Sequence, residues 1–460
     1  MKRDALRYLY GSTSISFIMR ICGVGLLFIA NVMLARALTP GEYGLYAYII
    51  EIAAFGAVIA CLGFDQIAVR IVPDLLADGN YSGLRRFLCS GIAAIIIGVL
   101  VIGVPLLAIW YRGLLPDSIS PTVLLLSVLL IVALSALRFG QEVLRAARRI
   151  AVSQVYEQLV WPMALLIVAA IMLAGTYSWA VSDIVILQIA IYASCAVLLF
   201  VAANRIGKRS AAGISTMGDA SVNMRTWLSI GVPLALSGML SVFLNRGDIL
   251  ALGIAVPTEV IAPYTAASRF SALMVLGLAA ASATTASLMR EYWRTGNKDS
   301  LQTCVDRATG VSVLFAIPLG AAFIFAPKYL MAIYGPDYLA GAAVLQVLGA
   351  AQFINALTGP VALIVIVCEM QKIYAATIAL AAILLAVLLA ALIPPFGTMG
   401  AAISTFISLV AINVLLAIMV WRRTGIRCWA SVSSVVITAA DILSSARAMR
   451  RKLGGGETNA

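Results

Sequence analysis

One stretch of the sequence decides the fold class, because it is long and apolar enough to span a membrane and yet contains charged residues. Residues 227–256 read WLSIGVPLALSGMLSVFLNRGDILALGIAV. About 20 apolar residues are enough to cross a bilayer as a helix, yet this stretch also holds Arg246 and Asp248. A charge at the centre of a membrane helix costs about 2.5 to 3.5 kcal/mol on insertion scales, so such residues usually face a bundle interior or a wet cavity. The stretch predicts a helical membrane protein with a polar interior.

The same combination recurs along the chain. Arg20 lies within the apolar span 15–35, Glu51 within 46–62 and Arg269 within 264–289. Apolar residues make up 62% of the sequence and charged residues only 11%, far from the composition of a soluble domain. We predict an all-α polytopic protein with twelve transmembrane helices. The predicted spans are 13–36, 43–68, 87–110, 121–141, 154–174, 179–203, 227–256, 261–289, 306–327, 339–367, 372–393 and 398–421.

The basic residues set the predicted orientation. If the N-terminus lies inside the cell, the cytoplasmic segments hold 25 of the 32 Lys and Arg residues, and the outer segments hold only Arg36, Arg112 and Lys328. Such an excess is the pattern of cytoplasmic loops. It predicts both termini in the cytoplasm and explains the net charge of +12 without nucleic acid as a partner.

The sequence offers little for catalysis. It has no histidine, and its seven cysteines are scattered without a C-x-x-C pair. Histidine catalysis and histidine metal ligands are therefore excluded, and the cysteines are best interpreted as small core residues. We expect no metal, no cofactor and no enzymatic activity.

A short repeat relates the two halves of the chain. The segment PGE at 40–42 follows the first span and precedes Tyr46, and PTE at 257–259 follows the seventh span and precedes Tyr264. Six spans separate these points, so both halves share one orientation, as in parallel repeats related by a pseudo-two-fold axis along the membrane normal. We predict an N-terminal six-helix lobe at 1–203, a cytoplasmic inter-lobe loop at 204–226, a C-terminal six-helix lobe at 227–421 and a cytoplasmic tail at 422–460. Within the tail, the apolar but short segment 428–443 is predicted to be interfacial or loosely ordered.

The repeat also aligns polar residues. Asn31 lies nine residues before Pro40 and Asp248 nine before Pro257, and Glu51 and Arg269 each follow a repeat tyrosine by five residues. At 1.5 Å per helical residue, nine residues place these groups about 14 Å from the outer surface. Two interpretations of Glu51 and Arg269 stay open: a gate between the lobes that substrate or a coupling proton breaks, or a static pair that ties the lobes together. Nearer the cytoplasm, Arg138 and Glu142 are spaced as a local i,i+4 pair.

Several segments resemble one protein family. The run 23–70, with ARALTPGEYGLY at 35–46 and LGFD at 62–65, resembles the start of bacterial polysaccharide flippases. These form the Wzx-like, polysaccharide-transporter branch of the superfamily that also contains MATE drug exporters and lipid II flippases. NRGD at 245–248, YTAASR at 264–269 and YGPDY at 334–338 match the pattern further along. The turn at 368–372 departs from it, which leaves the local turn between the tenth and eleventh spans in doubt.

The resemblance implies a function as well as a MATE-like fold. Such proteins move undecaprenyl-diphosphate-linked oligosaccharides across the bacterial inner membrane, for lipopolysaccharide or exopolysaccharide biosynthesis, by alternating access between two six-helix lobes. Membrane lipids are expected partners, and polysaccharide polymerase machinery is a candidate partner. The candidate site residues are those at membrane depth: Arg20, Arg246, Arg269, Asn31 and Asn245 for the substrate, and Glu51 and Asp248 for gating or coupling.

Two other functions stay open. A cation-coupled, MATE-like small-molecule exporter would share the fold, but several cavity arginines would repel cationic drugs. A membrane glycan polymerase or ligase would act on the same glycans, but it would need catalytic acid–base groups, and the predicted outer loops are short. Arginine suits a diphosphate because its planar fork donates several hydrogen bonds and stays charged.

Overall fold

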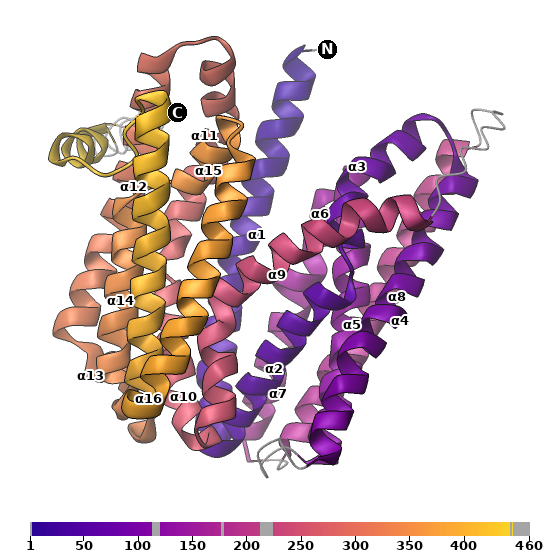
Figure 1. Ribbon diagram of the computed structural model, residues 1–460, viewed down its shortest axis with the longest axis vertical. Helices are drawn as coiled ribbons and strands as arrows, with labels where there is room; N and C mark the ends of the chain where they lie inside the picture. The colour runs from indigo at the N-terminus through magenta and orange to yellow at the C-terminus, as the bar shows by residue number, and fades with distance from the viewer. Residues whose placement is uncertain (1, 113–119, 176–178, 212–223, 442–443, 445–460) are drawn as a thin grey trace, which may run out of the picture. The chain divides into compact units, whose positions relative to one another are not determined.

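The computed structural model describes residues 2–112, 120–175, 179–211, 224–441 and 444. Over these residues the chain consists of helices and turns, without a strand, which confirms the all-α prediction (Figure 1). Eleven helical segments among them are long and apolar enough to cross a membrane. The chain is a multi-pass membrane protein.

The structure has eleven candidate membrane spans where twelve were predicted, because its last helix contains two of the predicted spans. Helix α16, Gln371–Thr424, has 54 residues and is broken at Gly397, whose φ of 54° and ψ of −128° are not helical. Pro394 and Pro395 precede the break, and neither can donate a backbone hydrogen bond. The two halves of α16 correspond to the predicted spans 372–393 and 398–421.

The chain forms two compact units. The first comprises Met1–Thr265, Ala332–Leu339 and Leu389–Ala401, and the second comprises Ala266–Met331, Ala340–Leu388 and Ala402–Ala460. Helix α9 and the first half of α10 thus group with the first unit. The six-plus-six division at 1–203 and 227–421 rests on the repeat and stays a prediction, and most of the predicted loop 204–226 lies outside the described residues.

The first unit contains the helices up to the middle of α10. Their bounds are α1 Lys2–Ala37, α2 Pro40–Ala60, α3 Phe64–Ala77, α4 Tyr81–Tyr111, α5 Pro121–Ala146, α6 Ile150–Val155, a π-helical turn Tyr156–Val160, α7 Trp161–Leu173, α8 Val181–Ala211, α9 Met224–Ala255 and α10 Thr258–Ala272.

The second unit contains most of the remaining helices. Their bounds are α11 Val275–Arg294, α12 Lys298–Phe325, α13 Pro327–Ala332, a 3-10 turn Pro336–Gly341, α14 Ala342–Leu357, α15 Val361–Val367 and α16. The short 3-10 turn and the middle of α16 fall largely in the first unit.

The predicted second span is wrong at its inner end. We expected one helix over 43–68, but α2 ends at Ala60 and α3 begins at Phe64. Leu62 and Gly63 between them have φ angles of 46° and 81°, a left-handed conformation that ends a right-handed helix. The turn is also tightly packed, because a Cβ on Gly63 would lie 1.9 Å from the carbonyl oxygen of Gly231 in α9.

Local capping explains where α2 begins. Thr39 caps the helix: its side chain accepts from the Glu42 backbone N–H, and the Glu42 carboxylate accepts from the Thr39 N–H at 2.9 Å. This reciprocal pair satisfies donors that the first turn leaves open. Pro40 occupies the first turn, where a missing N–H costs nothing.

Each unit has its own core. In the first unit, aromatic rings from α3, α4, α5 and α9 pack together: the ring of Phe87 lies 5.2 Å from that of Trp227 and 5.7 Å from those of Phe64 and Phe139. In the second unit, α11, α12, α15 and the last turns of α16 enclose an aliphatic core that also buries Ile426 and Cys428 from the tail. The described beginning of the tail is therefore part of the folded second unit.

Candidate functional site

A salt bridge at membrane depth joins α2 to α9 in the first unit. The guanidinium Nη1 of Arg246 lies 3.0 Å from Oε1 of Glu51. The Glu51 side chain is 3% exposed, whereas that of Arg246 is 36% exposed. The carboxylate is thus enclosed by protein, and the guanidinium keeps an accessible side. Removing one partner of such a pair leaves a buried charge uncompensated.

Asp248 follows Arg246 by two residues but is held by a different neighbour. Its Oδ2 accepts a hydrogen bond of 2.5 Å from the Tyr264 hydroxyl in α10, and its Oδ1 accepts from the Ile249 backbone N–H at 2.9 Å. Residues two apart point about 200° around a helix, so Arg246 reaches α2 while Asp248 reaches α10. The carboxylate of Asp248 therefore fastens α9 to α10.

The corresponding place in the first hairpin is occupied by an amide. Asn31 in α1 accepts from the Tyr43 hydroxyl of α2 at 3.3 Å, and its Nδ2 donates to the Leu27 carbonyl at 2.7 Å. Both polar atoms of Asn31 are engaged within the protein. Asn31 and Asp248 thus each accept a tyrosine hydroxyl from the following helix, although the repeat aligns Tyr264 with Tyr46 and not with Tyr43.

The two hairpins touch where their second helices begin. A Cβ on Gly44 would lie 1.9 Å from the Thr258 carbonyl oxygen, and one on Gly253 would lie 2.0 Å from the Tyr48 ring. Only glycine fits where backbone meets backbone this closely. The glycine of the EYG motif at 42–44 therefore lets α2 and α10 make contact.

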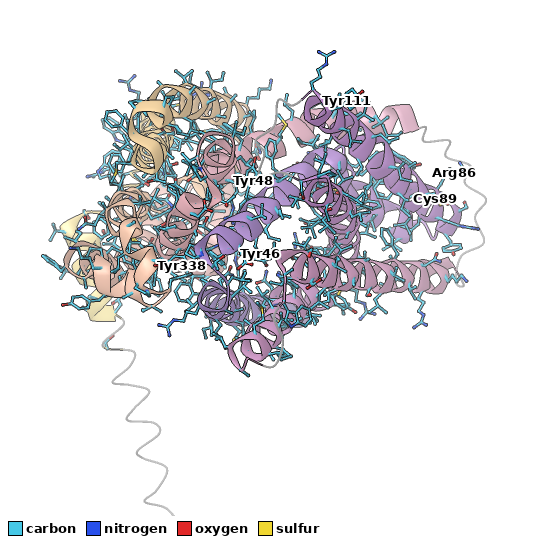
Figure 2. All side chains as sticks on the ribbon, turned by 90° about the horizontal axis from the view of Figure 1, so that it is seen from below. Tyr46, Tyr48, Arg86, Cys89, Tyr111 and Tyr338 are labelled. Atoms are coloured by element: carbon cyan, nitrogen blue, oxygen red, sulfur yellow. The ribbon has the colours of Figure 1, made fainter. Side chains whose placement is uncertain are left out.

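A tyrosine cluster joins two motifs that lie about 300 residues apart. The Tyr43 ring lies 6.0 Å from that of Tyr338 and 6.4 Å from that of Tyr334. The Tyr338 hydroxyl donates to the Ala35 carbonyl at 3.3 Å, and Nε of Arg36 donates to the Ile333 carbonyl at 2.7 Å. Figure 2 shows Tyr338 beside the beginning of α2, with Tyr46 and Tyr48 further along that helix. Sequence reasoning recognised both motifs but not their contact.

A cavity of about 400 Å³ adjoins this cluster. Its lining includes Arg36, Tyr334, Asp337 and Tyr338. Arg36 and Asp337 are exposed, so the cavity opens to the surroundings at the end of the first unit that carries the α1–α2 turn.

A second ion pair links α5 to α3. Nε of Arg138 lies 2.7 Å from Oδ2 of Asp65, which is buried. Glu142 instead pairs with Arg145 at 2.6 Å. Arg138 thus has a partner that its i,i+4 spacing with Glu142 did not predict, because the break at residues 62 and 63 brings Asp65 of the LGFD motif against α5.

The remaining predicted site residues are Arg20, Asn245 and Arg269. Arg20 is exposed on α1, and Asn245 is exposed on α9 with its Nδ2 bonded to the Ser241 carbonyl at 2.7 Å. Arg269 belongs to the second unit. A pair between Glu51 and Arg269 would join the two units and stays a prediction, as do the substrate roles of all these residues.

The described residues contain no group of three or more His, Cys, Asp or Glu side chains arranged to hold a metal ion. The chemistry available at the α2–α9 site is ionic. A half-exposed guanidinium with a buried carboxylate beside it can exchange that carboxylate for another anion.

Solved structures with the same fold are transporters. A multidrug-resistance MATE family transporter of the MOP superfamily, inward-facing, has a TM-score of 0.62 and 13% identity, over 88% of this chain and 98% of its own. Lipid II flippase MurJ, in an inward closed conformation, has a TM-score of 0.66 and 14% identity; the match covers 94% of this chain and 90% of the MurJ chain. A MOP superfamily transporter from Pyrococcus furiosus has a TM-score of 0.53 and 14% identity; the match covers 90% of this chain and 95% of the transporter chain.

The sequence comparisons are more specific. No curated protein sequence matches the chain significantly. A family model described as "Polysaccharide biosynthesis protein" matches residues 9–288, which is more than half of the chain and includes α1, α2, α9 and α10 with the Arg246–Glu51 pair. The chain therefore belongs to the polysaccharide biosynthesis protein family, and it has the fold of the MOP superfamily transporters.

Proposed function

We propose that this protein is a flippase that moves undecaprenyl-diphosphate-linked oligosaccharides from the inner to the outer leaflet of a bacterial inner membrane, with both termini in the cytoplasm. The polysaccharide biosynthesis family and the flippase and transporter fold support this function. The observation that carries it is the Arg246–Glu51 pair, whose guanidinium stays partly exposed at membrane depth.

The pair suggests how an anionic head group is bound and released. A diphosphate accepts bidentate hydrogen bonds from a guanidinium, and such charge-assisted bonds are about twice as strong as neutral ones. The diphosphate therefore competes with Glu51 for Arg246. Arg20 and Arg269 add positive charge along the proposed path, and the lipid tail stays in the bilayer.

Displacing Glu51 has a consequence. An uncompensated charge in a buried place costs about 3 to 5 kcal/mol, and Glu51 is 2% exposed. In this proposal the displaced carboxylate returns to Arg246 and expels the diphosphate once the head group faces the outer leaflet.

Asn31 and Asp248 have more structural roles in this proposal. Both polar atoms of Asn31 are bonded to α1 and α2, so we assign it to the hairpin and not to sugar. Asp248 holds α9 on α10 and thereby positions Arg246. Asn245, exposed on the same helix, is the better candidate for contact with sugar hydroxyls.

One observation favours the exporter as a second candidate. Glu51 and Asp248 carry two negative charges against the single positive charge of Arg246, and a net negative site attracts cations. An exporter would confer resistance to cationic dyes in a sensitive host. A flippase would not.

The flippase is tested by locating the lipid-linked glycan. The gene is deleted, and the diphosphate-linked glycan is assayed on each face of sealed, oriented membrane vesicles. We expect complete repeat units to accumulate on the cytoplasmic face, and wild-type protein or Arg112→Gln, an exposed arginine at the end of α4, to restore outward movement. Units that reach the outer face without the protein, but remain unpolymerised, would instead indicate the polymerase or ligase.

A further inference from the structure

The short helix after α16 has its polar and apolar faces reversed relative to a water-soluble helix. It spans Val432–Asp441, and its inward residues are the small polar Ser434 and Thr438, which are 6% and 4% exposed. Its outward residues are mostly aliphatic: Val432, Ser433, Val436, Ile437 and Ala440. Val432 is 83% exposed and Val436 60%. Leaving such side chains in water forgoes about 1.5 to 3 kcal/mol each.

The inward face fits the second unit closely. A Cβ on Gly310 in α12 would lie 2.3 Å from the Thr438 hydroxyl, so the helix packs directly on the α12 backbone. Arg307 pairs with Asp441 at 3.2 Å. Small inward residues thus allow a close approach, and the bulky aliphatic residues are left on the outside.

The segment that leads to this helix is fixed to the same unit. Gln302 exchanges two hydrogen bonds with the Arg427 backbone, at 2.8 and 2.9 Å, and the Ala430 N–H donates to the Leu357 carbonyl at 2.7 Å. Cys428 is fully buried, and burial raises the pKa of its thiol to about 12. The reversed orientation of the helix is therefore imposed by specific contacts.

The residues around the helix match a membrane surface. The rings of Trp421 and Trp429 pack together at 5.9 Å, and both side chains are exposed. Arg422, Arg423 and Arg427 are exposed beside them. Tryptophan is enriched at the membrane–water interface, and basic residues near a membrane are attracted to anionic lipid. Within the second unit, the helix lies beside the upper part of α12 and runs crosswise to it (Figure 1), as a helix that lies in the membrane interface does.

We propose that helix 432–441 lies in the interface of the predicted cytoplasmic leaflet, with Val432, Val436 and Ile437 among the acyl chains and Arg422, Arg423 and Arg427 on anionic phospholipid head groups. The proposal concerns bulk membrane lipid and does not depend on the transported substrate. It assigns the tail an anchoring surface that holds the end of α16 at a fixed depth.

The test measures the depth of the helix directly. Nitroxide labels are placed singly at Val436→Cys and Ile437→Cys in a cysteine-free full-length chain that still complements the gene deletion. The control label is placed at Lys298→Cys, which is exposed at the beginning of α12. The proteins are placed in nanodiscs of phosphatidylglycerol and phosphatidylcholine. We expect the two helix labels to be accessible to oxygen and at least tenfold less accessible than the control label to a water-soluble nickel chelate.

A second arm tests the charge. The triple variant Arg422→Gln, Arg423→Gln, Arg427→Gln should lose the preference of the helix for phosphatidylglycerol over phosphatidylcholine, as read by the same labels. Nickel accessibility at Val436→Cys equal to that at Lys298→Cys would overturn the proposal. Label-to-label distances showing two helices in contact would also overturn it, in favour of a second copy of the chain. An unchanged lipid preference in the triple variant would overturn the role of the arginines.

Discussion

The two hairpins α1–α2 and α9–α10 are each held by a tyrosine hydroxyl, but the group that accepts its hydrogen bond is neutral in one and ionisable in the other. In each, a polar residue nine positions before the proline accepts the hydroxyl of a tyrosine on the following helix. The tyrosines, Tyr43 and Tyr264, lie three and seven residues after their prolines. Positions four residues apart share a helix face, so the second contact is one turn deeper.

The difference lies in what accepts the hydroxyl. Asn31 is neutral and its bond to Tyr43, at 3.3 Å, is long for an O–H···O bond. Asp248 is ionisable, accepts at 2.5 Å, and follows the arginine that pairs with Glu51. In this contact the first hairpin uses a neutral acceptor and the second an ionisable one. Each hairpin also contributes one charge to the ion pair between them, Glu51 from α2 and Arg246 from α9.

The largest effect is expected from breaking the charged contact. Arg246→Ala removes the cation that faces the buried Glu51 carboxylate, so we expect a loss of about 3 to 5 kcal/mol of stability and loss of glycan transport. The double variant Glu51→Gln, Arg246→Gln removes both charges and should recover most of the stability but not transport. Thermal unfolding of purified protein and surface polysaccharide output measure the two effects. This account would be contradicted if Arg246→Ala unfolded at the wild-type temperature and produced as much surface polysaccharide as wild type.

The contact between the hairpins comes next. Gly44→Ala forces a methyl group against the Thr258 carbonyl, and overpacking of this kind costs about 1 to 3 kcal/mol. Gly25→Ala is the matched control, because a Cβ there meets nothing within 4 Å. Detergent-solubilised yield and thermal unfolding should fall for Gly44→Ala alone. Equal behaviour of the two variants would mean that the hairpins do not meet at Gly44.

Removing the two tyrosine hydroxyls compares the hairpins directly. Tyr264→Phe takes a donor from a buried carboxylate and should cost about 1.5 to 3 kcal/mol, whereas Tyr43→Phe breaks a long neutral bond and should cost about 0.5 to 1.5 kcal/mol. Thermal unfolding of the two variants gives the order. A larger loss for Tyr43→Phe would contradict the assignment of the stronger contact to Asp248.

The smallest effect is expected from making the second hairpin resemble the first. In Asp248→Asn the amide oxygen still accepts from Tyr264, so stability should change by no more than about 1 kcal/mol, and transport should fall less than tenfold. The glycan flux at two external pH values measures the effect. Complete loss of transport, or loss of its pH dependence, would make Asp248 the coupling residue that the sequence predicted.

Much of the fold follows from local sequence signals. Hydropathy located the membrane spans, including both halves of α16, because apolar length alone determines a crossing. The break between α2 and α3 was missed, since it depends on Leu62 adopting a positive φ, which few residues other than glycine, asparagine and aspartate do. The repeat related Asn31 to Asp248 by their place before a proline, and each accepts a tyrosine hydroxyl, but the equivalence of the two halves stays a prediction.

The partners of the charged residues were harder to predict. Glu51 and Arg246 are 195 residues apart, and Asp65 and Arg138 are 73 apart. Which charge meets which depends on helix rotation and on close approaches such as that of Gly63 to Gly231, which spacing along the chain does not encode. The contact of YGPDY with ARAL is of the same kind.

The most direct test of the central claim, that the Arg246 guanidinium moves a lipid diphosphate, is flipping by the purified protein in liposomes. The probe is a short-chain polyprenyl-diphosphate oligosaccharide, and its appearance on the opposite face is timed for wild type, Arg246→Lys, Arg246→Gln and the Arg112→Gln control. We predict wild-type rates for Arg112→Gln, an intermediate rate for Arg246→Lys and at least a tenfold loss for Arg246→Gln. A wild-type rate for Arg246→Gln would contradict the claim.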